Sequence, residues 1–254
     1  MIRYTFALLA ASSMLWQLDA SAVLAAGWGN LKGQFICDGK LPPPKAIDTS
    51  KEALCSKHQV VDETAVVGKD GGVANIVIFV SSKKVKVNPD LKKDLPDTVI
   101  IDNKGCRFEP HIVPMEVSQT LEIHNSDPFS HNSNVSPIGQ DSINPLLTEG
   151  AMATYKFARE LKSPTPVQCN IHGWMKAYVV VKDHPYIAVT DKDGNFEIKD
   201  LPLGKLEFTV WHEAQGYLSA KKEWKKGKFD LTIKEGDNDL KTIKVDPKLL
   251  TPKS

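Results

Sequence analysis

Residues 169–175 read CNIHGWM and carry the most distinctive set of donor groups in the chain. A thiol (Cys169), an imidazole (His172) and a thioether (Met175) follow one another at positions i, i+3 and i+6. A thiolate with two imidazoles and a weak, distant thioether is the ligand set that holds copper in electron-transfer sites. One short loop thus supplies three of four such groups, and a second imidazole has to come from elsewhere.

His131 is the candidate for that second imidazole. The segment TLEIHN (120–125) alternates as a strand does, and turn residues including Asp127 and Pro128 separate it from His131. A loop at the end of a rigid β scaffold is a natural place to present a ligand. His124 competes for the role, but its place inside the alternating strand predicts a side chain that faces solvent or a neighbour.

Two other interpretations of these residues stay open. Cys169 can form a structural disulfide, with Met175 as a core thioether that fills a gap. Alternatively, CSKH (55–58) and CNIH (169–172) provide two Cys-x2-His pairs for a tetrahedral zinc site, although this site would ignore Met175 and His131. The seven histidines include no His-x-His motif, which excludes the closely spaced histidine pairs of multicopper oxidases.

The N-terminus reads as an export signal over residues 1–26. Arg3 precedes an apolar stretch from Thr5 to Leu18, and small residues follow at Ala25 and Ala26. This stretch is too short to span a bilayer, and nothing else in the chain approaches the required length. We therefore expect a periplasmic or secreted protein with no membrane span in the mature chain.

The composition predicts an ordinary soluble globular protein of about 228 residues after export. Hydrophobic residues make up 41% and charged residues 25% of the chain. The 32 basic and 31 acidic residues leave no global field that would attract nucleic acid. In an oxidising compartment the four cysteines permit two disulfides, and they are Cys37, Cys55, Cys106 and Cys169.

Short runs rich in Val, Ile, Phe and Thr alternate with turn residues and predict a mostly β protein. The expected strands cover residues 30–37, 74–81, 98–102, 112–117, 120–125, 154–161, 167–169, 177–183, 195–201, 206–213, 228–234 and 241–246. A capping pattern predicts one short helix over residues 50–58. Two lysine-rich stretches, 82–93 and 221–228, are interpreted as solvated strand ends and turns.

Residues 97–183 resemble the cupredoxins, the type 1 copper proteins of the plastocyanin and amicyanin kind. The resemblance rests on FEPHIVPMEVSQTLEIHNSDPFSHN (108–132) and on the short Cys-x2-His-x2-Met loop. It implies a Greek-key β-sandwich with one type 1 copper, whose ligands are His131, Cys169, His172 and Met175. It also implies that Asn132 ties the two ligand loops together. The chain departs from the family pattern at Ser118, Asn170 and Ile171, which leaves the turn geometry and the reduction potential open.

Residues 188–217 resemble a carboxypeptidase regulatory-like, transthyretin-like β-sandwich, through TDKDGNFEI and LPLG. The opening strands of such a module are found far upstream, within the N-terminal β segment 27–96. We therefore predict a copper domain over 97–183 inserted into a second sandwich, to which 27–96 and 184–254 both contribute strands. Three sequential units are the alternative.

Outside the ligand set, the sequence supports only modest predictions. We expect a disulfide between Cys55 and Cys106, with Cys37 free, as one of three pairings. Cys106 and His111 are an alternative minor metal site. His184 and His212 are expected to be structural, and a binding face made of Trp211, His212 and Glu213 is an alternative role for that strand.

The expected function is the transfer of single electrons between redox partners. The resemblance implies weak, transient docking of a partner protein on an apolar rim around His172, made of Phe129, Ile171 and Trp174. No nucleophile–base pair or nucleotide loop is visible in the sequence, so we expect no enzymatic activity. The alternative is a copper carrier or a non-redox binding module of the cell envelope.

Overall fold

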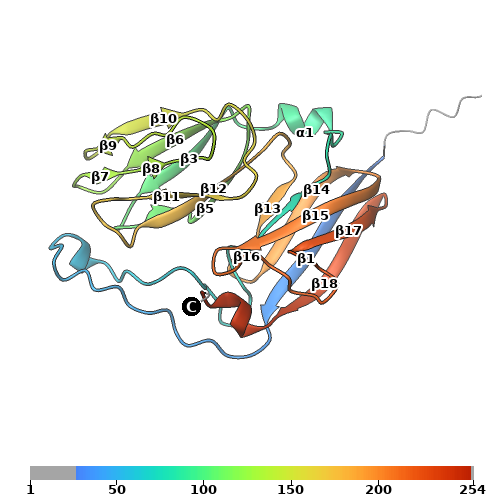
Figure 1. Cartoon of the computed structure of the whole chain (residues 1–254), viewed down its shortest axis with the longest axis horizontal. Coiled ribbons are helices and arrows are strands. Elements are labelled where there is room, and N and C mark those ends of the chain that lie inside the picture. Colours follow the sequence, from blue (N-terminus) through green and yellow to red (C-terminus); the bar gives the residue numbers. More distant parts are fainter. Residues whose placement is uncertain (1–26, 253–254) are drawn as a thin grey trace, which may run out of the picture.

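Four β-sheets form two sandwiches in the computed structural model, which describes residues 27–252 (Figure 1). The prediction of a mostly β protein is confirmed. The expected export signal, residues 1–26, lies outside the described residues. Within residues 27–252, no helix is long and apolar enough to cross a membrane.

The first sandwich, here called the outer sandwich, combines strands from the N-terminal and the C-terminal parts of the described chain. One sheet has the order β14–β1–β18, and the other has the order β13–β2–β15–β16 with β17 paired to β15. Its strands are β1 (Trp28–Cys37), β2 (Val77–Val80), β13 (Ile187–Val189), β14 (Asn195–Pro202), β15 (Gly204–His212), β16 (Gly216–Tyr217), β17 (Lys228–Ile233) and β18 (Gly236–Val245). Strands before and after the middle of the chain thus share both sheets, and the domain boundaries stay a prediction.

The second sandwich, here called the central sandwich, is built from the middle of the chain. Its sheets have the orders β10–β6–β3–β4 and β5–β12–β11–β8, and a small sheet β7–β9 lies beside them. Its strands are β3 (Thr98–Asn103), β4 (Phe108–Glu109), β5 (Ile112–Glu116), β6 (Thr120–Asn125), β7 (His131–Asn132), β8 (Asn134–Val135), β9 (Leu146–Leu147), β10 (Met152–Tyr155), β11 (Thr165–Gln168) and β12 (Lys176–Lys182).

Two strands with continuous apolar runs explain how the sandwiches meet. In β12, Val179 packs into the core of the central sandwich, while Tyr178 and Val180 pack into a separate cluster on the opposite face. In β2, Ile78 packs into the core of the outer sandwich, while Phe79 joins that same separate cluster. Because side chains alternate across a strand, each run buries both faces. The result is a third apolar layer between the sandwiches.

A long connection, residues 38–76, leaves β1 and passes beside the central sandwich before it returns to β2 (Figure 1). A disulfide joins Cys55 in this connection to Cys106 in the central sandwich, and Cys37 is free, so this predicted pairing is confirmed. The helix predicted over 50–58 reduces to a single 3₁₀ turn at Cys55–Lys57.

The structure corrects three sequence-based elements. The stretch 82–93 contains a short helix, α1 (Pro89–Lys93), because Asn88 caps it and proline suits the first helical position. Strand β10 ends at Tyr155, earlier than the predicted 154–161. Strand β18 begins at Gly236, before the predicted 241–246, because it pairs in parallel with β1 along its whole length.

Candidate metal centre

A tight hairpin presents Cys169, His172 and Met175. Strands β11 and β12 are antiparallel, and Gln168 pairs with Lys176, so the seven residues between them form the turn. The Met175 N–H donates to the His172 carbonyl (2.8 Å), and the Cys169 N–H donates to the Met175 carbonyl (3.2 Å). These bonds curl the loop so that the residues at i, i+3 and i+6 lie close together.

His131 reaches the same place from a different part of the chain. It begins β7, where it pairs with Leu147 of β9, and it is fully buried. The preceding turn is held by Asn125, whose side-chain amide donates to the carbonyls of Phe129 (2.8 Å) and Leu147 (2.9 Å). The turn residues noted in the sequence therefore direct His131 toward the hairpin.

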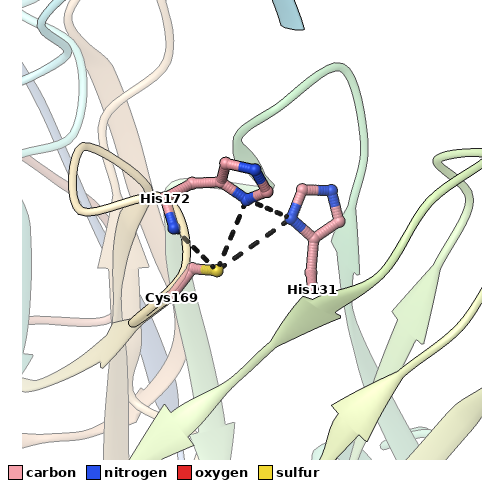
Figure 2. A group of neighbouring side chains, drawn as sticks. All are labelled: His131, Cys169 and His172. Atoms are coloured by element: carbon pink, nitrogen blue, oxygen red, sulfur yellow. Dashed lines mark hydrogen bonds between the residues drawn. The ribbon is translucent and has the colours of Figure 1, made fainter. Parts of the chain in front are cut away.

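Three side chains converge, and Figure 2 shows them pointing toward one another. The Nδ1 atoms of His131 and His172 lie 3.0 Å apart. The Cys169 Sγ lies 4.0 Å from the first and 3.7 Å from the second. All three residues are buried, and among the described residues no other group of three or more Cys, His, Asp or Glu side chains converges in this way.

Asp127 fixes the orientation of His131. Its Oδ2 accepts a hydrogen bond from His131 Nε2 at 2.9 Å, and the same carboxylate accepts from the Gly105 and Cys106 N–H groups. The proton is thereby placed on Nε2, and the Nδ1 lone pair faces Cys169 and His172. A carboxylate bound to the outer nitrogen is the usual support of a metal-ligating histidine.

Both imidazoles are held in the neutral form that binds metals. Burial lowers the pKa of His131; the hydrogen bond with Asp127 opposes this effect, and the nearby His172 adds to it. Burial also lowers the pKa of His172, against the attraction of Glu52. Metal binding to a neutral histidine does not have to displace a proton from the ring.

Asn132 joins the two loops. Its Oδ1 accepts hydrogen bonds from the N–H groups of Asn170 (2.8 Å) and Ile171 (3.2 Å), and it lies 3.5 Å from the Cys169 sulfur. The His172 N–H also points at that sulfur from 3.4 Å. The loops that carry His131 and Cys169 are therefore locked to each other by a side chain next to the first histidine.

Apolar and aromatic residues pack near the group. Met175 is buried in the same apolar cluster as Cys169. Ring centroids lie 4.8 Å apart for Phe129 and His131, and 5.3 Å apart for His172 and Trp174. Of the rim residues predicted from the sequence, Ile171 is exposed, whereas Phe129 and Trp174 are partly buried.

The other cysteine and histidine sites have other roles. The zinc site built from Cys55 and the site built from Cys106 with His111 are both excluded, because the two cysteines form a disulfide. His124 is partly exposed and pairs with Glu122 at 3.1 Å. His184 is structural as predicted, since its Nε2 bonds the Val80 carbonyl at 3.1 Å.

The structure excludes the alternative of a binding face made of Trp211, His212 and Glu213. Trp211 is 6% and His212 is 0% exposed, and the Glu213 side chain is buried, so His212 is structural, as expected from the sequence. Trp211 packs in the layer between the sandwiches, at 4.8 Å from Tyr178. A strand in a central position of a stacked sheet buries both faces, which the alternating pattern alone does not reveal.

Two residues near the centre were not identified from the sequence. Asp127 was recognised only as a turn residue, although a carboxylate four residues before a candidate ligand is a usable signal. Glu52 comes from the long connection, and its Oε2 lies 3.9 Å from His172 Nε2. No sequence spacing links residues 120 positions apart, so only the fold reveals this neighbour.

Comparisons with known proteins give structural likenesses alone. No family model matches the chain, and no curated protein matches it. A Cu-containing nitrite reductase (NirK) from Thermus scotoductus SA-01 is 23% identical over 38% of this chain and 27% of the enzyme, with a TM-score of 0.32. Two amicyanin variants, a methionine-to-alanine variant in the Cu(I) form and a proline-to-alanine variant in the oxidized state, are each 16% identical over 41% of this chain and 98% of theirs, with a TM-score of 0.31. Such low TM-scores carry no argument about this chain.

Proposed function

We propose that the chain is an exported mononuclear type 1 copper protein that carries single electrons between redox partners. The observation that carries this proposal is the convergence of two neutral imidazoles and one thiol in a buried site, each presented by hydrogen-bonded backbone. Met175 completes the proposed ligand set, and the central sandwich is proposed to be cupredoxin-like.

The donor set fits a metal ion of this kind. Bonds of about 2.0–2.1 Å to nitrogen and about 2.3 Å to sulfur place the donor atoms of a trigonal or tetrahedral ion roughly 3.3–3.8 Å apart. The observed separations of 3.0, 3.7 and 4.0 Å lie close to this range. Two imidazoles with one thiolate favour copper in a trigonal arrangement with a weak axial sulfur.

The residues of the site suit electron transfer because they are held still. Copper bound there would supply one-electron chemistry between its two common oxidation states. Asp127 fixes the His131 ring, and Asn132 fixes the hairpin. The donor atoms would therefore keep one arrangement in both oxidation states of a bound copper ion. The burial of His131 and His172 excludes bulk water and leaves a substrate little access, which supports a carrier over an enzyme.

We propose that a redox partner docks over the exposed apolar residues beside the site. Ile171 is 49% exposed in the ligand hairpin, and Leu146 is 64% exposed on the strand paired with Asn132. Two exposed apolar side chains next to a buried redox group suit a small, short-lived contact. Export to the periplasm or the cell exterior is supported by the Cys55–Cys106 disulfide, because such bonds persist in oxidising compartments.

The outer sandwich is proposed to be a transthyretin-like module whose strands flank the copper domain. The turn DKDG supports this proposal, because Asp191 accepts hydrogen bonds from the N–H groups of Asp193 and Asn195 and directs the chain into β14. Strand β14 then pairs with β1 from the N-terminal segment.

Visible absorption and EPR spectra after addition of one equivalent of Cu(II) test the proposed function. An intense thiolate-to-copper band with a small copper hyperfine splitting would support the type 1 assignment. A colourless protein, or an ordinary tetragonal copper signal, would show that Cys169 is not a ligand and would overturn it.

A copper carrier is the second candidate function, since Glu52 of the long connection faces His172 and its side chain is 47% exposed. A carboxylate at the edge of the site could receive a departing ion. Release of the metal on reduction would favour the carrier, whereas repeated cycling with an unchanged spectrum would favour electron transfer.

A further inference from the structure

His111 lies between two carboxylates where three parts of the chain meet. Its Nε2 is 2.7 Å from Glu213 Oε2, and its Nδ1 is 3.7 Å from Glu63 Oε2. Glu63 belongs to the long connection, His111 precedes β5 of the central sandwich, and Glu213 follows β15 of the outer sandwich. The His111 side chain is 8% exposed and that of Glu213 is 4% exposed, so both groups are largely removed from solvent.

The contact with Glu213 sets the tautomer of His111. Burial is the largest influence on the pKa of Glu213 and raises it, but hydrogen bonds with His111 and Thr64 and the attraction of His111 and Lys176 together bring the pKa below its usual range. The Glu213 carboxylate accepts a hydrogen bond from the Nε2–H group of His111. The Nδ1 atom on the other side of the ring has no hydrogen-bond partner among the described residues.

A cavity of about 170 Å³ opens at this position. Its polar and charged lining includes His111, Glu63, Glu213 and Asp62, together with the cations Arg107 and Lys176. Trp174 and Met175 of the ligand hairpin border it as well. Glu63 divides its two oxygens between neighbours, because Oε1 lies 3.7 Å from Arg107 while Oε2 faces His111. Burial raises the pKa of Glu63 despite the attraction of His111 and Arg107. The Glu63 carboxylate is thus largely removed from water, and its Oε2 lies beside His111.

We propose that this cavity is a second metal site, in which His111 Nδ1 and Glu63 Oε2 bind a divalent ion of the zinc type and water fills the remaining positions. Bonds of about 2.0–2.2 Å from one ion to nitrogen and oxygen separate the two donors by roughly 3.4 Å at a tetrahedral angle and by roughly 4.2 Å in a line. The observed 3.7 Å falls between these limits.

The two proposed donors of this site, His111 and Glu63, supply nitrogen and oxygen, whereas the candidate metal centre supplies nitrogen and sulfur. Glu213 supports the outer nitrogen of His111 as a carboxylate supports the ligating histidine of many zinc sites. An ion bound here ties the long connection to the central sandwich, while Glu213 brings in the outer sandwich. The site therefore joins three parts of the chain at one point.

Zinc stoichiometry of the full-length mature chain tests this proposal, by equilibrium dialysis with Zn²⁺ alone. The chain is compared with its His111→Gln variant, both as wild type and in a Cys169→Ser background in which the candidate metal centre is disabled. We expect His111→Gln to remove one equivalent of Zn²⁺ in both backgrounds. Glu213→Gln changes only the group that supports the His111 ring. We expect it to lower the affinity for that Zn²⁺ ion by about 10- to 100-fold.

His124→Gln is the matched control, because His124 also pairs with a glutamate but lies outside the cavity. It should leave the zinc stoichiometry unchanged. Equal stoichiometry for the wild type and His111→Gln would overturn the proposal, as would a folded His111→Gln variant whose thermal midpoint rises with Zn²⁺ as much as that of the wild type. Since the difference is read in both backgrounds, failure of the candidate copper centre would leave this result interpretable.

Discussion

The two sandwiches bury different kinds of residue. The core of the outer sandwich is filled by large apolar side chains such as Phe35, Phe208 and Trp224, with His212 and Thr209 as buried polar exceptions on β15. The central sandwich has a similar apolar core, but one end of it buries polar side chains, including Asp127, His131, Asn132 and His172. Within the described residues, the central sandwich brings three potential metal-binding side chains together in its interior, whereas the outer sandwich does not.

This difference shows what a buried site requires. An unpartnered polar group in a protein interior costs on the order of 1–3 kcal/mol. In the central sandwich Asp127 satisfies three donors and Asn132 satisfies two backbone N–H groups, so the polar end is internally paired. The two Nδ1 atoms and the sulfur face one another instead, and a metal ion would satisfy all three. Chemistry and stability should therefore respond to substitutions in different places.

Removal of a buried cysteine should give the sharpest contrast. Cys169 and Cys37 are both free and buried, but only Cys169 lies in the candidate metal centre. Cys169→Ala should abolish the thiolate-to-copper absorption band, while Cys37→Ala should retain it at full intensity. Copper titrations followed by visible absorption decide the matter, and equal bands in the two variants would contradict the ligand assignment.

Truncation of an aromatic residue in the core of the outer sandwich should lower stability and leave copper binding unchanged. Phe208 is fully buried and stacks on Phe229 with ring centroids 5.2 Å apart. Phe208→Ala should lower the free energy of unfolding by about 3–5 kcal/mol, because it leaves a cavity. The copper spectrum of the folded variant should stay unchanged. Urea denaturation followed by circular dichroism measures the loss, and a shifted spectrum would show that the sandwiches are coupled at the site.

Acid should destabilise the protein through His212, a buried histidine of the outer sandwich with an unpartnered ring nitrogen. Burial lowers the pKa of His212 to about 4, and its Nε2 has no hydrogen-bond partner among the described residues. Because the unfolded chain takes up this proton near pH 6.5 and the folded chain does not, stability should fall as the pH drops from about 6.5 to about 4. The loss is at most about 3 kcal/mol.

This effect is measured as the slope of the unfolding free energy against pH, in the metal-free wild type and in the His212→Gln variant. His131 and His172 add losses of the same sign, since their pKa values are also lowered. His212→Gln should therefore reduce the slope without removing it. An identical slope in wild type and variant would show that His212 does not resist protonation.

The sequence was most informative where chemistry and local pattern coincide. The CNIHGWM loop and the turn before His131 predicted the three residues that converge, because ligand spacing and turn residues are local features. Glu52 and the outer partner of His111 could not be found, since contacts between distant segments depend on how the sandwiches stack. The same limit applies to Trp211, for which the sequence left an exposed binding face open as an alternative, although the residue is buried. Helix α1 was missed because a lysine-rich composition hid a capped Asn-Pro start.

A change at Asn132 should have the smallest effect of these substitutions, a modest loss of copper affinity. This residue donates no proposed ligand, but its Oδ1 holds the Asn170 and Ile171 N–H groups beside the sulfur. Asn132→Ala should weaken copper affinity by about 10-fold, toward the lower end for residues that orient ligands, and should retain a broadened band. Asn134→Ala is the control, because the Asn134 side chain only accepts a hydrogen bond from Ser136. If competition titrations gave equal affinities for the two variants, the hairpin would hold its shape unaided. The proposed metal ligands, and not the hydrogen bonds that Asn132 makes around them, would then distinguish the central sandwich from the outer one.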